Sequence, residues 1–522
     1  MTARSHNSWR LIAIAAALAI LLAVFLRTAW VSDDAYITFR VVDQFLHGHG
    51  PRWNLAERVQ PYSHPLWFLL LSLVTAVVRE PYYAAIGLSL VCALSGAALL
   101  SGAVRRLPLA TTGLGVALLL SSKAFIDFSS SGLENPLTTL LLSMFFVVWW
   151  RAADRGDRYE DTRALVLVGS LLFINRTDAA LLILPAIVIR LAALPWRQAL
   201  RAVCIGGVPV LAWESFSLFY YGFPFPNTAY AKLTTGVPLA DLATQGLAYY
   251  RDSLRVDPAT LAVVAAALVV AVCTRPRRDW TIAFGLVAYL IYVLRIGGDF
   301  MSGRFFVAPF VVAVAVLIDR ARRWPAPIVL AAAVVVIAVG VRAPRIAALS
   351  GANYEVAGWP KGIADERGIW YQMTGLMRRE KTWLPPVTNT PRKMPNDAKA
   401  LRMIAAGRTI AVQDTIGMYG YQAPLTLHIV DVLGLADPFL SKLPCLSWRI
   451  GHFYRPPPEG YLDTLESGTN QIKDPNLARY YDDIALVTRG PLVSRARLAA
   501  IIRLNFGVDN HLLPTSAPYG GP

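Results

Sequence analysis

The chain has 522 residues, of which 55% are hydrophobic and only 16% are charged, whereas a soluble globular protein carries roughly 25% charged residues. The shortage of charge and the long apolar runs exclude an ordinary soluble domain and predict a membrane protein. Lys and Arg exceed Asp and Glu by 50 − 34 = 16. These basic residues cluster between apolar runs, where they set membrane orientation, so we expect a lipid bilayer and no nucleic acid as partner.

About eleven apolar runs are candidate membrane-spanning helices, because a span needs about 20 mainly apolar residues. The first run follows Arg4 and Arg10 and has no clear cleavage site after it, so it is interpreted as a retained signal anchor. The candidate spans cover residues 11–30, 84–104, 107–122, 137–150, 164–174, 180–194, 203–221, 259–274, 280–296, 305–318 and 326–341.

One further run, residues 65–78, begins with Pro65 and is short for a span. If it crossed the membrane, Arg105 and Arg106 would lie outside and every later basic cluster would change sides. We therefore predict a helix at the outer interface, which places all five basic clusters in the cytoplasm, as the positive-inside rule requires. The clusters occupy residues 105–106, 151–163, 197–201, 275–278 and 320–323.

This topology predicts a multi-pass plasma-membrane protein with a cytoplasmic N-terminus and two domains. Residues 1–342 form the catalytic transmembrane domain, including an outer loop at 31–83, and residues 343–522 form an extracytoplasmic α/β domain. In that second domain the runs 409–412 and 427–433 resemble strands and 494–505 resembles a helix. Its length suits a separate domain that binds the carbohydrate acceptor.

Two adjacent acids, Asp33 and Asp34, follow the first predicted span directly. One carboxylate would suffice to cap the next helix. Two carboxylates side by side at the membrane edge are costly unless a cation, an arginine or a substrate hydroxyl engages them. We therefore interpret them as catalytic: a carboxylate can deprotonate an acceptor hydroxyl, stabilise an oxocarbenium-like transition state or hold a metal.

The other unusual polar residues also lie in predicted outer segments, which favours a single extracytoplasmic site. One set consists of cations suited to a phosphate group, which an arginine guanidinium can bind in a bidentate way. The other set consists of polar and aromatic side chains suited to a sugar or an acceptor. The candidates for the donor phosphate are Arg176, Lys232, Arg304 and His64. The candidates for sugar or acceptor contacts are Glu134, Asp299, Arg58 and Trp67.

Each of these residues also has a structural explanation. Arg176 and Asp178 are close enough in sequence to pair with each other, His64 and Glu134 stand where helices begin, and Trp67 is typical of an interface anchor.

The sequence shows no Walker motif and no strand-associated Gly-x-Gly-x-x-Gly. A lipid-linked phosphosugar donor needs no nucleotide. Such a donor fits the absence of these motifs and the cations and carboxylates of the predicted outer segments.

Several motifs resemble the GT-C membrane glycosyltransferases, and among them the actinobacterial terminal arabinofuranosyltransferases. In the box before Pro65 this chain has His64 where that family usually has serine. The resemblance is carried by Asp33-Asp34-Ala-Tyr-Ile-Thr-Phe-Arg40, Trp53-Asn, Glu57-Arg-Val, Pro65-Leu-Trp67, Ser131-Gly-Leu-Glu134-Asn-Pro, Asn227-Thr-Ala-Tyr-Ala-Lys232, Gly297-Gly-Asp299-Phe-Met, Gly303-Arg304-Phe, Asp414-Thr-Ile-Gly, Val430-Asp-Val-Leu-Gly-Leu435-Ala-Asp and Gly451-His452.

The resemblance implies a GT-C fold with the catalytic acids at Asp33 and Asp34. It implies decaprenyl-phosphate arabinofuranose as donor and the non-reducing end of arabinan, in arabinogalactan or lipoarabinomannan, as acceptor. The product would be a terminal β(1→2) arabinofuranose. No dedicated cofactor and no metal-binding motif are expected, although the paired acids leave a divalent cation open.

Two alternatives remain at this point. A GT-C enzyme of the same architecture could use another polyprenyl-phosphate sugar, such as mannose. A lipid-linked sugar transporter is the alternative from another class, and it would more often show inverted repeats and polar residues at mid-bilayer. The polar residues of this chain lie instead at the predicted outer edge, which favours the enzyme.

Overall fold

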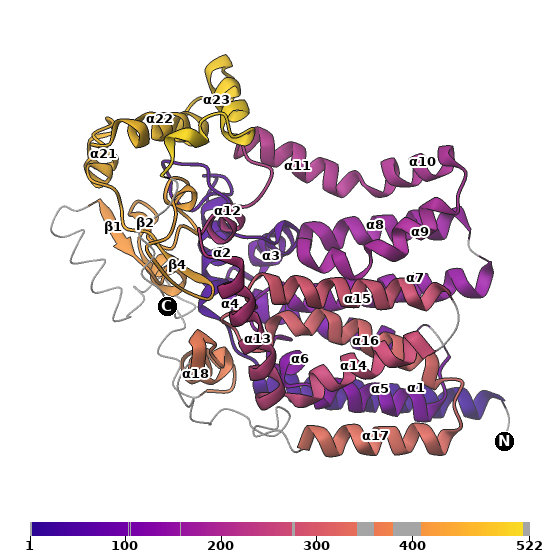
Figure 1. Ribbon diagram of the computed structural model, residues 1–522. Coiled ribbons are helices and arrows are strands. Elements are labelled where there is room, and N and C mark those ends of the chain that lie inside the picture. The colour runs from indigo at the N-terminus through magenta and orange to yellow at the C-terminus, as the bar shows by residue number, and fades with distance from the viewer. Residues whose placement is uncertain are drawn as a thin grey trace. The chain divides into compact units, whose positions relative to one another are not determined.

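A computed structural model describes residues 3–102, 104, 106–156, 158–273, 277–341, 360–378 and 409–514 of the chain (Figure 1). Residue contacts divide the chain into two compact units, each assembled from three separate stretches. Unit 1 comprises Met1–Ser32, Tyr82–Val210 and Leu239–Lys381, and unit 2 comprises Asp33–Pro81, Leu211–Pro238 and Thr382–Pro522. The chain therefore leaves unit 1 between Ser32 and Asp33, directly before the two acids.

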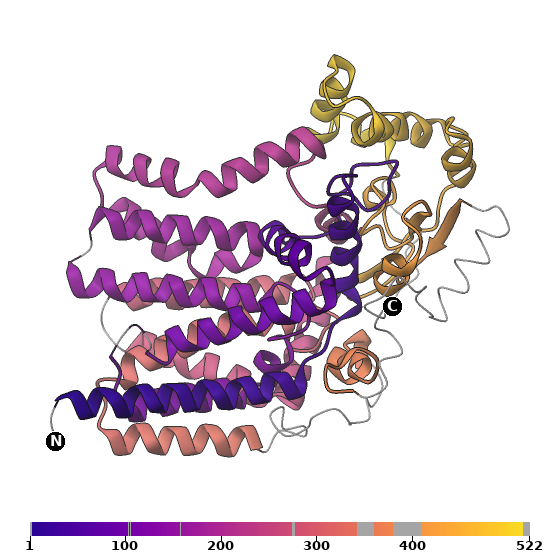
Figure 2. The ribbon, with the colours of Figure 1, turned by 180° about the vertical axis from the view of Figure 1, so that it is seen from behind.

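Unit 1 is built from helices. Several of them, such as α7, α15 and α16, lie side by side and run roughly parallel to one another (Figures 1 and 2). The described elements are α1 Ala3–Thr28, α4 Pro81–Leu100, α5 Leu109–Ser121, α6 Lys123–Asp127, α7 Asn135–Arg155, α8 Tyr159–Asn175, η1 Thr177–Leu182, α9 Leu184–Ala192, α10 Trp196–Gly206, α13 Leu239–Val256, α14 Pro258–Cys273, α15 Arg277–Arg295, η2 Arg304–Phe306, α16 Val307–Ala321, α17 Ala326–Val341, η3 Pro360–Gly362 and α18 Glu366–Thr374.

Several helices of the described residues have the length and apolar composition of membrane spans. Three qualify individually, namely Arg10–Thr28, Pro81–Leu100 and Asn135–Arg155, and up to five qualify if each of two bent helix pairs is one span. The run predicted at 180–194 is divided into η1 and α9, and the run at 203–221 is bent by 55° between α10 and α11. The helices indicate a polytopic membrane protein; the number of eleven spans and their orientation stay predictions.

Unit 2 combines short helices with two small sheets. Its elements are α2 Asp33–Leu46, α3 Pro65–Val78, most of α11 Val208–Tyr220, α12 Asn227–Leu233, β1 Ile410–Gln413, α20 Gly417–Gln422, β2 His428–Asp431, η4 Leu440–Lys442, β3 Ser447–Arg449, β4 His452–Tyr454, α21 Tyr461–Ser467, α22 Pro475–Arg489, α23 Arg495–Asn505 and η5 Asn510–Leu512.

The predicted local elements of unit 2 are present. The run 65–78 forms α3, which begins at Pro65, while its position at the membrane interface stays a prediction. Strands β1 and β2 pair in parallel with Ile410 opposite His428, and β3 and β4 pair antiparallel. The helix expected at 494–505 is α23, whose N-cap Ser494 accepts a hydrogen bond from the Arg497 amide.

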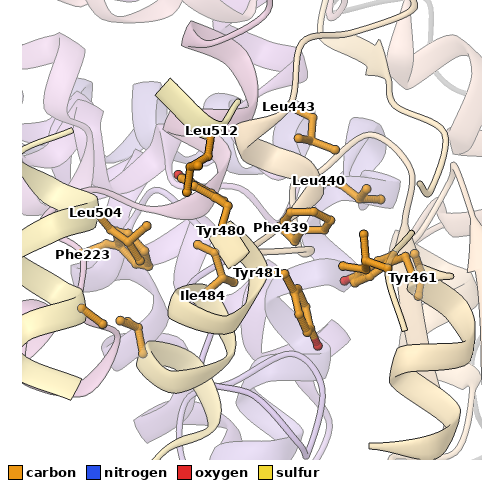
Figure 3. Close-up of a cluster of buried hydrophobic side chains, with 14 of the residues drawn as sticks. Phe223, Phe439, Leu440, Leu443, Tyr461, Tyr480, Tyr481, Ile484, Leu504 and Leu512 are labelled. Carbon is orange, nitrogen blue, oxygen red and sulfur yellow. The ribbon is translucent and has the colours of Figure 1, made fainter. Parts of the chain in front are cut away.

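The core of unit 2 is a cluster of aromatic and aliphatic side chains (Figure 3). Phe439 lies 5.2 Å from Tyr461 and 5.3 Å from Tyr481, measured between ring centroids, in the tilted and edge-on arrangements that aromatic pairs favour. Phe223, from the stretch between α11 and α12, belongs to the same cluster. The C-terminal residues therefore share their core with an earlier part of the chain. The predicted division at residue 342 stays a prediction, and residues 342–359 and 379–408 lie outside the described part.

Candidate active site

The two predicted catalytic acids begin helix α2. Both lie in its first turn, where the helix dipole favours negative charge. Asp33 is buried, and its Oδ1 accepts a hydrogen bond of 2.8 Å from the backbone amide of Met418. Asp34 is partly exposed. The pair is therefore asymmetric: one carboxylate is held inside unit 2 and its neighbour reaches toward solvent.

Burial is the main influence on the Asp33 carboxyl and raises its pKa to about 7. The Met418 amide opposes this shift and the charge of Asp34 adds to it. The pKa of Asp33 thus lies near neutrality, where a carboxyl group can exchange a proton with a substrate hydroxyl.

Helix α20 lies against the start of α2 without any space between them. A methyl group placed on Gly417 would overlap the backbone carbonyl and a carboxylate oxygen of Asp33. Glycine is required here for close approach, since no side chain fits between the two segments. The Asp414-Thr-Ile-Gly motif therefore ends at a residue that contacts the first acid.

Arg40, about two turns further along α2, anchors this helix to the rest of unit 2. Its guanidinium is fully buried and donates to the carbonyls of Trp53, Gly420, Ala423 and Leu427. It also lies 5.0 Å from the centroid of the Trp53 ring, within cation–π range. The arginine thus fixes α2 and α20 in one arrangement.

His64 contacts the same helix. Its Nε2 lies 2.9 Å from Thr38 Oγ1, and the ring is buried where α3 begins. The predicted sugar-contacting residues of this loop are buried too: Trp67 is fully buried, and Arg58 donates to the carbonyls of Val487, Gly490 and Tyr220. In this structure Arg58 joins the first outer loop to α22, and His64 joins α2 to α3.

Lys232 is exposed on α12 and belongs to a group of cations. Its charge helps to lower the pKa of His452, after burial and the neighbouring Arg449, and brings that pKa to about 3. Arg449 Nη2 lies 3.0 Å from His452 Nε2. Lys232 and Arg449 are thus two cations whose charges both influence His452, and the Asp414 carboxylate opposes them.

Unit 1 gathers three other predicted site residues around the buried carboxylate of Glu134. Glu134 Oε1 lies 2.8 Å from Arg176 Nη1 and 3.1 Å from Arg304 Nη2. Arg176 also pairs with Asp178 at 2.9 Å, as its sequence position suggested, and Arg304 Nη1 lies 3.7 Å from Asp299 Oδ2. Two arginines and three acids thus form a buried network with a net charge of −1.

Glu134→Ala is expected to destabilise the protein by about 3–5 kcal/mol, because it leaves two buried guanidinium groups without their shared carboxylate. The measurement is the free energy or midpoint of unfolding in detergent. Glu160→Ala is the matched control: Glu160 is exposed at the start of α8, and its loss should cost less than about 1 kcal/mol. Equal effects of the two substitutions would contradict the network.

The comparisons with known proteins agree with the motifs. The chain is 27% identical to the terminal β-(1→2)-arabinofuranosyltransferase of Mycobacterium tuberculosis, over 81% of this chain and 80% of that protein. It is 24% identical to the Corynebacterium glutamicum protein of the same name, over 81% of this chain and 72% of that one. This chain is a glycosyltransferase. The resemblance predicted from the motifs is confirmed.

Two further comparisons complete the picture. No protein-family model matches the chain. The arabinosyltransferase EmbB from Mycobacterium smegmatis aligns with a TM-score of 0.42 and 14% identity, over 59% of this chain, and the glycosyltransferase spans 30% of the EmbB chain.

Sequence reasoning missed one buried network of the glycosyltransferase, centred on Glu57. Burial alone would raise the pKa of Glu57, but His428, Arg489 at 3.1 Å and the Asn54 amide hold it below its usual value. Near this carboxylate, burial and the charge of Glu57 raise the pKa of Asp437 to about 7. The Glu57-Arg-Val motif was a signal, but the charged partners His428 and Arg489 lie more than 370 residues away and no local pattern points to them.

Among the described residues, no three His, Cys, Asp or Glu side chains form a group that could hold a metal ion. The described residues of the glycosyltransferase therefore contain no assembled metal site. The divalent cation that the paired acids left open is not tested by this finding.

Proposed function

We propose that this glycosyltransferase transfers arabinofuranose from decaprenyl-phosphate arabinofuranose to the non-reducing end of cell-wall arabinan and forms a terminal β(1→2) linkage. The observation that supports this most is the similarity to two terminal β-(1→2)-arabinofuranosyltransferases along four-fifths of the chain. We propose a GT-C fold with the active site and the C-terminal residues on the extracytoplasmic face, where a lipid-linked donor and a wall glycan meet.

In the proposed reaction a hydroxyl of the acceptor attacks the anomeric carbon of the donor sugar. The new glycosidic bond forms as the bond between that carbon and the phosphate oxygen breaks, and polyprenyl phosphate leaves. One carboxylate of the pair Asp33 and Asp34 receives the hydroxyl proton or stabilises the positive charge at the anomeric centre, and its neighbour orients it. The two carboxyls are adjacent and the charge of Asp34 contributes to the raised pKa of Asp33, so we propose the pair as a unit and assign no separate roles.

For the donor phosphate we propose Arg176, Lys232, Arg304 and His64 as candidate ligands. Lys232 has the most favourable setting, because it is exposed and lies near further cations. Arg176 and Arg304 already share Glu134, so a phosphate would have to compete with that carboxylate. Glu134, Asp299, Arg58 and Trp67 remain the candidates for sugar or acceptor contacts.

The test is a reconstituted transfer assay with synthetic polyprenyl-phosphate arabinofuranose and a short arabinan acceptor, with the product linkage read by mass spectrometry and NMR. The expected result is one added terminal β(1→2) arabinofuranose. Polyprenyl-phosphate mannose is the parallel donor, and preferred use of mannose would overturn the sugar assignment. Protein that moves the lipid across vesicles without transferring sugar would overturn the enzyme assignment.

The pH dependence of transfer should follow Asp33. Because the pKa of Asp33 is raised to about 7, the carboxylate fraction grows as the pH increases from 5 to 8. If this carboxylate acts as the base, kcat/KM should rise through about pH 7 and then level off. Measuring kcat/KM from pH 5 to 9 checks this, and a profile that falls over the same interval would show that the protonated form is required.

A further inference from the structure

Residues 29–32, which directly precede Asp33, are held in unit 1 by an unusually complete set of contacts. All four are fully buried and lie outside any helix or strand. An irregular buried segment must satisfy its backbone polar groups through other parts of the chain. The segment is also the last part of unit 1 before the two acids, so the chain passes directly from it into α2.

Helix α18 supplies one side of these contacts. Thr374 Oγ1 accepts a hydrogen bond from the Val31 amide at 3.1 Å and lies 2.8 Å from the Val31 carbonyl. The Leu376 amide donates to the Ala29 carbonyl at 2.9 Å, and the Tyr371 hydroxyl donates to the Arg27 carbonyl at 2.6 Å. Tyr371 and Thr374 of α18, together with Leu376 just after this helix, thus contact the backbone at Arg27, Val31 and Ala29.

The stretch from α6 to α7 supplies the other side. The Trp30 indole donates to the Asp127 carbonyl at 2.7 Å, and the Ser32 amide donates to the Ser131 carbonyl at 2.9 Å. The Trp30 ring also packs edge-on against Phe128, with 6.2 Å between centroids. The segment therefore lies between α18 and the residues that follow α6.

A buried charge network joins these two sides to each other. Arg367 Nε of α18 lies 2.5 Å from Asp127 Oδ1, and Lys123 of α6 pairs with both Asp127 and Asp365, the latter at 3.1 Å. These opposite charges pair with one another, which lowers the cost of burying them. Asp365 is also the N-cap of α18, since it accepts from the Gly368 amide.

We propose that Thr374 and Arg367 are positioning residues, which hold the segment 29–32 so that Asp33 and Asp34 enter α2 in the catalytic geometry. This rests on the proposed function of the two acids. Neither residue touches substrate: Thr374 acts by bonding the backbone two residues before Asp33, and Arg367 acts by fixing α18 to Asp127. We call the contacts of Tyr371, Thr374 and Leu376 with the segment and the pair of Arg367 with Asp127 the clamp. A displacement of about 1 Å at reacting groups can lower a rate about 100-fold, so the clamp affects catalysis without contributing a reacting group.

The experiment compares Thr374→Val, which keeps the shape but loses the bonding to Val31, with two reference variants. Thr374→Ser restores a hydroxyl. Thr112→Val is the matched control, because Thr112 is also buried and donates to the Ser101 carbonyl at 3.1 Å, a bond that involves none of the residues named as holding the segment 29–32. Transfer is measured as separate kcat and KM values for the polyprenyl-phosphate arabinofuranose donor, together with the melting temperature.

For Thr374→Val we expect kcat to fall about 10- to 100-fold with KM for the donor unchanged, a melting temperature equal to that of Thr112→Val, and recovery in Thr374→Ser. Hydrogen exchange of the Val31 amide should be about fivefold faster, since its acceptor is lost. If Thr374→Val does not fold, Tyr371→Phe removes one hydroxyl of the clamp and should lower kcat several-fold.

An unchanged kcat, a loss no larger than in Thr112→Val, or a rise in KM alone would overturn the proposal. Failure of the proposed function looks different, since the wild-type protein would then transfer no arabinofuranose from the donor. In that case the hydrogen-exchange rate still tests whether Thr374 holds the segment. An unchanged exchange rate of the Val31 amide in Thr374→Val would overturn the proposed clamp.

Discussion

Asparagine at position 33 or 34 is expected to lower transfer from polyprenyl-phosphate arabinofuranose by about 10²- to 10⁴-fold, the range for loss of a general base. Asparagine keeps the size of aspartate but can neither take up the acceptor proton nor carry the negative charge. At position 33 its side-chain oxygen can still accept from the Met418 amide, which lies 2.8 Å from Oδ1. The fold should therefore persist, and a buried charge that is costly to desolvate disappears.

The measurement is initial-rate transfer in proteoliposomes, with the melting temperature recorded for each variant. Asp43→Asn is the matched control, because Asp43 lies on the same helix, is partly exposed and pairs with His47. We expect that control to retain transfer and the position-33 variant to melt at or above the wild-type temperature. Full activity in both Asp33→Asn and Asp34→Asn would defeat the assignment of the catalytic pair.

Gly417→Ala is expected to lower transfer by about 10- to 100-fold, because the added methyl must displace Asp33. The overlap is with the Asp33 backbone carbonyl as well as with its carboxylate, so a side-chain rotation cannot relieve it. Overpacking of this kind also destabilises a protein by about 1–3 kcal/mol. The predicted result is a folded protein of lower melting temperature whose kcat falls much more than its stability explains.

Transfer kinetics and thermal unfolding of Gly417→Ala test this directly. Gly87→Ala, in α4, is the control, because a methyl group at that position would meet nothing within 4 Å. Its activity and stability should match the wild-type protein. If Gly417→Ala were equally silent, then Asp33 would not depend on close contact with α20, and the raised pKa of Asp33 would need another explanation.

The two predictions together separate the acid from its surroundings. Asp33→Asn changes the chemistry and leaves the geometry, whereas Gly417→Ala leaves the carboxyl and changes its position. An enzyme that uses Asp33 directly must respond to both substitutions. An enzyme that uses only Asp34 would respond to Gly417→Ala through the displaced helix start, and would tolerate Asp33→Asn.

The sequence by itself determined the local features of this protein. Apolar runs predicted membrane-type helices. Pro65 marked the start of α3 and Ser494 marked the start of α23, because helix starts depend on a few neighbouring residues. The family motifs directed attention to Asp33 and Asp34. Arg176 with Asp178 was also a local inference, since only one residue separates them.

Only the tertiary structure decided which distant groups meet. Asp33 accepts from an amide 385 residues later, Glu134 pairs with an arginine 170 residues away, and Arg367 reaches Asp127 across 240 residues. Buried charges and close glycine contacts depend on the path of the whole chain, and no local periodicity encodes that path. The sequence thus determined which acids to consider, and the structure decided that one of them is buried against Gly417.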